Sequence, residues 1–128
     1  MSDNLHSTNV ELVRSMSQNF VAGRLDAVKV HIADEMIMTL PDGLPYGGVY
    51  RGWDGYLAVV TALGNYWSEV SFAPPQYLGA ADKVVVLTAI KGKTRDGRSI
   101  EMPLAEIWEV HGGLVDKITA FYFDTKAI

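Results

Sequence analysis

Apolar side chains between residues 10 and 21 recur at intervals of three or four, the spacing of one face of an α-helix. Ser7 or Thr8 can cap the start of this helix, and Gly23 can end it. A second, shorter helix is expected next, with Asp26 as its cap. The pattern therefore predicts a helical hairpin at the N-terminal end of the chain.

Residues 36–40 alternate apolar and polar side chains, which indicates a strand. The segment 41–52 is rich in proline and glycine and is expected to be a loop with a short strand around 49–50. Helical spacing returns from residue 53 or 54 to about 65, where Gly64-Asn65 can close a third helix. The remaining pattern predicts strands at 67–72, 76–81, 83–93, 98–111 and 114–124, separated by Pro74-Pro75, Ala81-Asp82, Asp96-Gly97 and Gly112-Gly113.

Helices followed by a run of hairpin-connected strands, without alternation of strand and helix, are typical of an α+β domain. We therefore expect a meander of antiparallel strands with the helices packed on one face of a curved sheet. The chain has 128 residues, which is enough for one hydrophobic core without disulfides. A single domain over residues 1–128 follows.

Composition excludes several classes of function. The sequence has no cysteine, so disulfides, thiol catalysis and thiolate metal sites are excluded, and its three histidines lack the spacing of a metal site. A net charge of −4 argues against nucleic acid as a partner. No apolar run is long enough to span a bilayer, and no secretory signal is visible at residues 1–4. We expect no metal and no membrane contact, and a cytoplasmic location.

Two carboxylates stand in otherwise apolar strand faces near the end of the chain. Glu106 alternates in phase with Leu104 and Trp108, and Asp124 with Tyr122. A buried charge must be paired, protonated or directed at a polar cavity, so these residues are candidate catalytic groups. If Gly112-Gly113 centre a hairpin, Glu106 lies opposite residue 118, roughly 20 Å from Asp124 along a flat sheet. The two carboxylates then mark two ends of a cavity.

The order of elements resembles the nuclear transport factor 2-like superfamily. Local motifs are similar to its SnoaL-like, ketosteroid-isomerase-related branch: residues 44–55 (LPYGGVYRGWDG), residues 96–98 (DGR) and residues 121–125 (FYFDT). The resemblance covers nearly the whole chain and implies a cone-shaped antiparallel sheet with three helices on its concave face. It also implies a small hydrophobic ligand, no cofactor and a homodimer formed through the outer face of the sheet.

The resemblance to ketosteroid isomerases holds for only one of their catalytic residues. The isomerase base is an aspartate before a proline, and here Leu40 precedes Pro41. The isomerase tyrosine on the first helix matches Met16, which cannot donate a proton. Glu106 matches the protonated acid of the isomerase, a carboxyl group kept neutral by an apolar site. Asp124 is compatible with the acid/base aspartate of the SnoaL-type aldol cyclases, so the resemblance implies isomerisation, cyclisation or dehydration by carboxylates rather than steroid isomerisation.

A hydrophobic pocket requires apolar and aromatic walls, and the sequence supplies candidates on several elements. The alternative is a non-catalytic ligand-binding or dimerisation module of the same fold, in which these residues fill the core and Glu106 is tied to an internal partner. An open pocket with a free carboxylate oxygen would instead favour an enzyme or a carrier. The candidate ligand-binding residues are Met16, Phe20, Met38, Trp53, Tyr56, Trp108 and Tyr122.

Three further features have simpler interpretations. His31 is a candidate acid or base, but a single histidine on a helix is more often a packing residue. Tyr46 and Tyr50, in the glycine-rich loop, are candidates for a lid or entrance. The basic residues around Asp96-Gly97 are expected to be solvated charges at a hairpin tip: Lys91, Lys93, Arg95 and Arg98.

Overall fold

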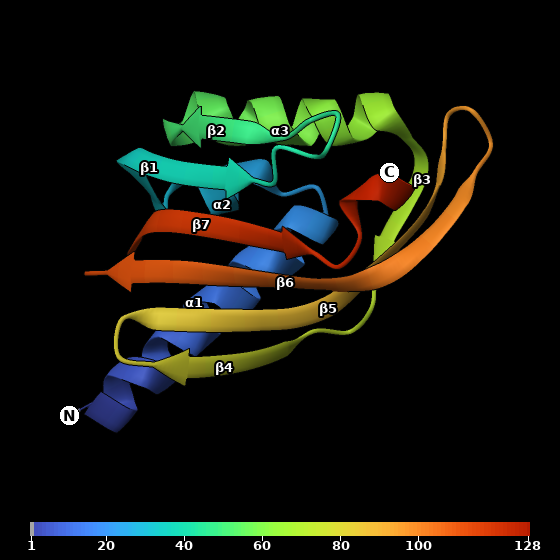
Figure 1. Ribbon diagram of the computed structural model, residues 1–128. Coiled ribbons are helices and arrows are strands. Elements are labelled where there is room, and N and C mark those ends of the chain that lie inside the picture. The colour runs from blue at the N-terminus through green and yellow to red at the C-terminus, as the bar shows by residue number, and fades with distance from the viewer. Residues whose placement is uncertain (1) are drawn as a thin grey trace.

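The computed structural model describes residues 2–128, with side chains from residue 8 onward. Helices and strands follow the order expected from the sequence (Figure 1). The described helices are α1 (Ser2–Val21), α2 (Leu25–Lys29), α3 (Gly52–Tyr66) and the 3-10 turn η1 (Thr125–Ala127). The described strands are β1 (Ile32–Leu40), β2 (Gly48–Arg51), β3 (Trp67–Phe72), β4 (Gln76–Ala80), β5 (Lys83–Thr94), β6 (Ser99–His111) and β7 (Leu114–Tyr122).

The strands form one curved sheet in the order β2-β1-β7-β6-β5-β3, with β4 also paired to β5. All described pairs are antiparallel except β1 and β7, which run in the same direction (Figure 1). The meander of antiparallel strands expected after α3 is therefore confirmed, and the pairing of β1 with β7 makes the sheet as a whole mixed rather than antiparallel throughout. Both strands start from the same end, where the carbonyl of His31, just before β1, accepts a hydrogen bond from the Val115 amide at the start of β7.

Strand irregularities bend this sheet around the helices. Register shifts occur between Glu109 and Val110 in the pairing of β6 with β7, and between Trp67 and Glu69 in that of β3 with β5. At Gly92 of β5, an added Cβ atom would lie 2.2 Å from the Glu69 carbonyl oxygen. Because only glycine fits there, β3 can cross close to β5 where the sheet curls over.

The boundaries of the helices differ from expectation at three points. α1 begins at Ser2 rather than after Ser7 or Thr8, because no proline or glycine interrupts the preceding residues. Arg24, not Asp26, is the N-cap of α2, and Asp26 lies in its first turn. α3 continues through Gly64 to Tyr66, where the Trp67 amide donates to the Leu63 carbonyl and the chain passes directly into β3.

Apolar side chains form two connected core clusters. The larger lies between the helices and the inner face of the sheet and includes Val13, Met36 and Ile118, all fully buried. The smaller lies where β3, β5 and β6 curl together, around Trp67 and Ile90. Partly buried residues such as Tyr122 contact both clusters, so the two cores meet at the inner wall of the cone.

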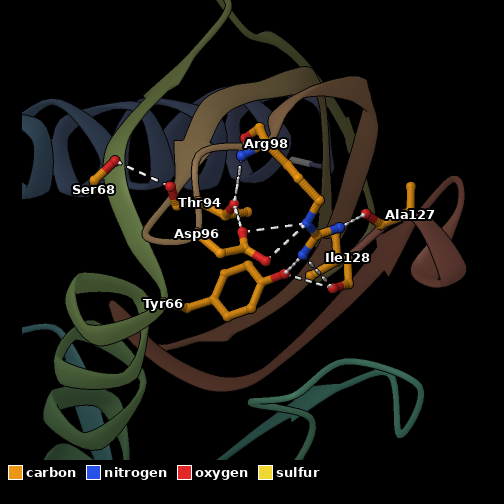
Figure 2. Close-up of polar contacts among 7 residues, drawn as sticks. All are labelled: Tyr66, Ser68, Thr94, Asp96, Arg98, Ala127 and Ile128. Carbon is orange, nitrogen blue, oxygen red and sulfur yellow. Dashed lines mark hydrogen bonds and ion pairs between the residues drawn. The ribbon is translucent and has the colours of Figure 1, made fainter.

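The basic residues near the β5–β6 turn are exposed, as the sequence predicts, but two of them, Arg95 and Arg98, also bind other segments of the fold. The Arg98 guanidinium pairs with Asp96 and donates to the Tyr66 hydroxyl and to the carbonyls of Ala127 and Ile128 (Figure 2). Arg95 donates to the Gly64 carbonyl at the end of α3. Lys91 and Lys93 remain exposed or half-exposed on β5. Arg98 therefore fastens the C-terminal segment to this turn and to α3, a contact that neither periodicity nor charge count reveals.

Candidate functional site

A cavity of about 530 Å³ lies between α1, α3 and the inner face of the sheet. Its wall is mainly aliphatic and aromatic, contributed by both core clusters and by the two helices. Val21, Ala22 and Pro75 line it and are themselves exposed. The cavity therefore opens between the C-terminal half of α1 and the connection from β3 to β4.

Strand register arranges the inner wall as parallel rows of side chains. One row crosses four strands from Tyr77 on β4 through Val86 and Glu106 to Ala120 on β7. The row on one side of it contains Thr88, Leu104 and Tyr122, and the row on the other side contains Val84, Trp108 and Ile118. Glu106 thus lies in the middle of the wall, with aromatic side chains in the rows on both sides.

Glu106 is the single carboxylate among the described residues that line the cavity. Trp108 Nε1 donates to its Oε1 over 2.9 Å, and no hydrogen bond among the described residues engages Oε2. Burial raises the pKa of the Glu106 carboxyl, and the Trp108 hydrogen bond only partly opposes this. This shift is toward the protonated acid, the form in which Glu106 can donate a hydrogen bond to a molecule in the cavity that it lines.

Two tyrosines in the cavity wall are also donors. Burial is the main reason that the pKa of Tyr56 and that of Tyr122 are raised, and the hydrogen-bonded Tyr46 raises the pKa of Tyr122 further. Trp67 Nε1 donates to the Tyr46 hydroxyl, which in turn donates to the Tyr122 hydroxyl over 3.0 Å. Because the Tyr122 oxygen already accepts, its own proton is free to point elsewhere, and the chain of bonds polarises it for donation.

The structure brings most of the candidate residues from the sequence into one cavity. Glu106, Met16, Phe20, Met38, Tyr56, Trp108 and Tyr122 all line it. Trp53 does not. It stacks on Tyr56 with ring centroids 5.3 Å apart and lines a separate hollow at the start of α3.

Asp124 lies outside the cavity lining because β7 ends at Tyr122, two residues before the end expected from the sequence. Its exposed side chain accepts a hydrogen bond from the Lys126 amide and caps η1. The register also differs from expectation. The bulge at Glu109 and Val110 places Glu106 opposite Ala120 rather than residue 118. The two carboxylates are therefore not brought together.

The glycine-rich loop does not form a lid with its tyrosines. Tyr46 is buried in the core, and its carbonyl accepts a hydrogen bond from the Tyr50 hydroxyl. His31 also lies away from the cavity, with Nδ1 3.3 Å from the Gly113 carbonyl at the β6–β7 turn. Tyr46, Tyr50 and His31 therefore make contacts within the fold and do not line the cavity.

Sequence reasoning missed the polar residues on α1 at the cavity. Arg14, Ser17 and Gln18 line it, and the Arg14 guanidinium lies over the Tyr77 ring, 5.0 Å from its centroid. These positions repeat at intervals of three and four beside Met16, so they form a polar stripe along the apolar face of the helix. This polar stripe on the apolar face of the helix was the feature of the sequence that could have indicated these cavity residues.

In the part of the chain that the structure describes, no group of three or more histidine, aspartate or glutamate side chains is placed to bind a metal ion. The described helices also include none with the length and apolar character needed to cross a bilayer. The polar groups among the described lining residues are a carboxyl, a guanidinium, phenols, an indole, an amide and two aliphatic hydroxyls.

A family model for the SnoaL-like domain matches residues 13–119, most of the chain. The protein belongs to the SnoaL-like family. Comparison with curated proteins gives no match. In this SnoaL-like protein Leu40 and Met16 line the cavity, so the positions that the resemblance equates with the isomerase base and tyrosine carry apolar side chains.

Solved structures share the fold of this SnoaL-like chain. An NTF2-like protein of unknown function from Burkholderia pseudomallei is 25% identical, with a TM-score of 0.84 over 93% of this chain and 92% of that one. TerC, co-crystallised with polyporic acid, is 17% identical, with a TM-score of 0.83 over 93% of each chain. A Pseudomonas putida protein, assigned provisionally as a polyketide cyclase, is 15% identical, with a TM-score of 0.75 over 89% and 90%. The last two comparisons establish the fold alone.

Proposed function

We propose that this protein binds a hydrophobic small molecule in the cavity and polarises a carbonyl group of that molecule. The observation that carries the proposal is the Glu106 carboxyl, which has one oxygen fixed by Trp108 and the other free in an apolar wall. A neutral acid there can donate to a ligand oxygen, and the Tyr122 hydroxyl in the neighbouring row is a second donor. The neighbour co-crystallised with polyporic acid is consistent with a small-molecule ligand in this fold.

The chemistry that follows is proton transfer without a cofactor. Donation by Glu106 and Tyr122 to a ketone oxygen would stabilise the enol or enolate that forms when the neighbouring carbon loses a proton. The same intermediate is common to isomerisation, aldol-type cyclisation and dehydration. Because Asp124 does not line the cavity, we assign Glu106 as the acid that passes its proton to the carbonyl oxygen while a water molecule removes the carbon proton, and the resulting hydronium ion then returns a proton to Glu106.

The experiment measures hydrogen–deuterium exchange at the α-carbons of 2-tetralone, a bicyclic ketone with a benzylic α-carbon, by NMR in D₂O. We expect the wild-type protein to accelerate exchange and Glu106→Gln to lower the rate by at least about 100-fold, the usual contribution of a general acid or base. Glu101→Gln is the matched control, because Glu101 is on the same strand but is exposed. Binding is followed in parallel by the fluorescence of Trp108.

The results separate an enzyme from a binder. Loss of exchange with retained binding in Glu106→Gln supports proton transfer by this residue. Binding without exchange in the wild-type protein would favour the non-catalytic alternative, a carrier of the same fold. Equal exchange rates and equal affinities in the wild-type and Glu106→Gln proteins would remove Glu106 from the site.

We also propose that the chain forms a homodimer through the outer face of the sheet. Leu87, Ala105 and Phe121 are direct neighbours across β5, β6 and β7, and each alternates with an inward-facing residue. The side chains of Phe121 and Leu87 are 50% and 39% exposed. An apolar row of this kind on an outer face favours association with a second copy of the chain.

A further inference from the structure

Two charged groups from the described part of the chain line the cavity, and only one of them is explained by the proposed function. Glu106 and Arg14 are the charged residues among the described residues that line the cavity. The remaining lining groups are apolar or carry neutral hydroxyl, amide or phenol groups. A guanidinium at the wall of an apolar cavity is unusual, since a hydrophobic ligand alone gains nothing from it.

Strand register gives the distance from Glu106 to Tyr77, the residue over which the Arg14 guanidinium lies. Its guanidinium lies over the Tyr77 ring, and Tyr77 belongs to the same inner row as Val86 and Glu106. Two strand spacings separate Tyr77 from Glu106, which is about 10 Å. A ligand that accepts from Glu106 at one end can therefore reach Arg14 with a chain or ring system of that length.

Most N–H groups of the Arg14 guanidinium have no hydrogen-bond partner among the described residues. Among the described residues, its guanidinium donates from Nη1 to Glu11, one helical turn earlier. This pair is exposed, with 38% of the Arg14 side chain accessible, and such surface pairs contribute little stability. The guanidinium carries five N–H groups in a planar fork that suits a carboxylate, so an anionic ligand group can bind to it while the Tyr77 ring holds its plane.

We propose that Arg14 is a specificity-determining residue that binds an anionic group of the ligand, so that the natural ligand is an aryl or alicyclic keto acid rather than a neutral hydrocarbon-like ketone. Its carbonyl oxygen meets Glu106, its apolar body fills the cavity, and its carboxylate or equivalent anion pairs with Arg14 on the α1 side. This inference rests on the proposed function, because it assumes that the cavity is the binding site.

The probe is 6-(naphthalen-2-yl)-6-oxohexanoate, and the comparison ligand is its neutral methyl ester. Kd values are measured for both by tryptophan fluorescence at fixed salt. We expect Arg14→Gln to weaken binding of the acid by about tenfold or more, as for the loss of a charge-assisted hydrogen bond, and to leave the ester unchanged. Arg14→Lys, which keeps the charge, should restore most of the affinity for the acid.

Two control variants separate the failure of this inference from the failure of the proposed function. Arg51→Gln removes the same charge at an exposed position outside the cavity and should bind both ligands as the wild-type protein does. Ala120→Phe fills the cavity beside Glu106 and should weaken both ligands.

Equal affinity of wild-type and Arg14→Gln proteins for the acid, with both ligands weakened by Ala120→Phe, would overturn the role of Arg14 and leave the cavity as the binding site. No effect of Ala120→Phe on either ligand would overturn the proposed function as well. The proposed function would also be overturned if neither ligand bound to the wild-type protein.

Discussion

At the scale of single residues, His111 lies between two carboxylates at the end of the sheet opposite the β5–β6 turn. Its Nδ1 contacts Asp116 on β7, and its Nε2 lies 2.6 Å from an Asp82 oxygen in the turn before β5. Both ring nitrogens can donate at the same time only when the imidazole is protonated. The hydrogen bonds with Asp116 and Asp82 accordingly raise the pKa of His111, and the bond with His111 lowers the pKa of Asp82.

These shifts predict how the stability of the protein depends on pH. The His111 contribution is fully present below its ordinary pKa of 6.5 and is lost as the pH rises through the raised value. The Asp82 contribution is present above its ordinary pKa of 3.8 and is lost as the pH falls through the lowered value. Thermal melts should therefore show the largest difference in Tm between wild-type and His111→Asn proteins between those two pH values. A difference that is the same at pH 5 and at pH 9 would contradict this account.

Alternation with period two placed Glu106 on the inner face correctly, and the structure adds its partner. Trp108 is two residues away on the same face, so its indole reaches the carboxyl along one strand. Asp124 could not be placed in this way. A period-two pattern does not reveal where pairing stops, and the last two residues of the expected strand leave the sheet, where Asp124 caps η1. Arg14 was missed because its neighbours on α1 gave a stronger apolar signal.

At the scale of elements, two glycines predict opposite effects of the same substitution. A Cβ atom at Gly92 would lie 2.2 Å from the Glu69 carbonyl oxygen and 2.8 Å from the Trp67 ring, so alanine must push β3 away from β5. A Cβ atom at Gly64 in α3 meets nothing within 4 Å. Gly92→Ala should cost about 1–3 kcal/mol of unfolding free energy, as overpacking does. Gly64→Ala should gain up to about 1 kcal/mol, because alanine favours the helix.

Urea unfolding of both variants measures these changes against the wild-type protein. A stable Gly92→Ala protein with unchanged midpoint would show that β3 does not approach β5 as closely as described. Destabilisation by Gly64→Ala would show that this end of α3 is not helical.

The extents of the strands after α3 followed from periodicity and turn residues to within two residues, whereas β1 begins at Ile32, before the alternating segment. The helix ends were predicted less accurately. Gly64 commonly ends a helix, but α3 continues to Tyr66, and the next residue, Trp67, is buried in the core. The hydrogen bonds by which Arg98 holds the C-terminal segment were not predicted from the sequence either (Figure 2). Its partners include backbone carbonyls about 30 positions away, which no local pattern encodes.

At the scale of the whole molecule, the apolar outer row leads to a prediction about assembly. Phe121→Asp places a charge in the apolar row of the proposed dimer interface and should convert the dimer to a monomer in analytical ultracentrifugation. Val30→Asp is the matched control, because Val30 is an apolar exposed residue outside that row. A wild-type protein that sediments as a monomer, or a Phe121→Asp protein that stays dimeric, would refute the interface.

The fold class was predictable because the order of helices and strands restricts the architecture to few solutions. The pairing of β1 with β7 was not, since periodicity specifies which face of a strand is buried but neither its partner nor its direction. The cavity depends on that pairing. Met38 on β1 lies beside Ile118 on β7, and both line the wall.

The parallel pair also determines when the protein can finish folding. During synthesis, residues 32–40 leave the ribosome long before residues 114–122, so β1 has β2 as its sheet neighbour and lacks the other until β7 has been made. Until then the backbone edge of β1 that faces away from β2 has no partner in the sheet. Contacts so distant in sequence are slow to form and leave apolar surface open to aggregation, so the arrival of β7 completes the described sheet and first encloses the cavity.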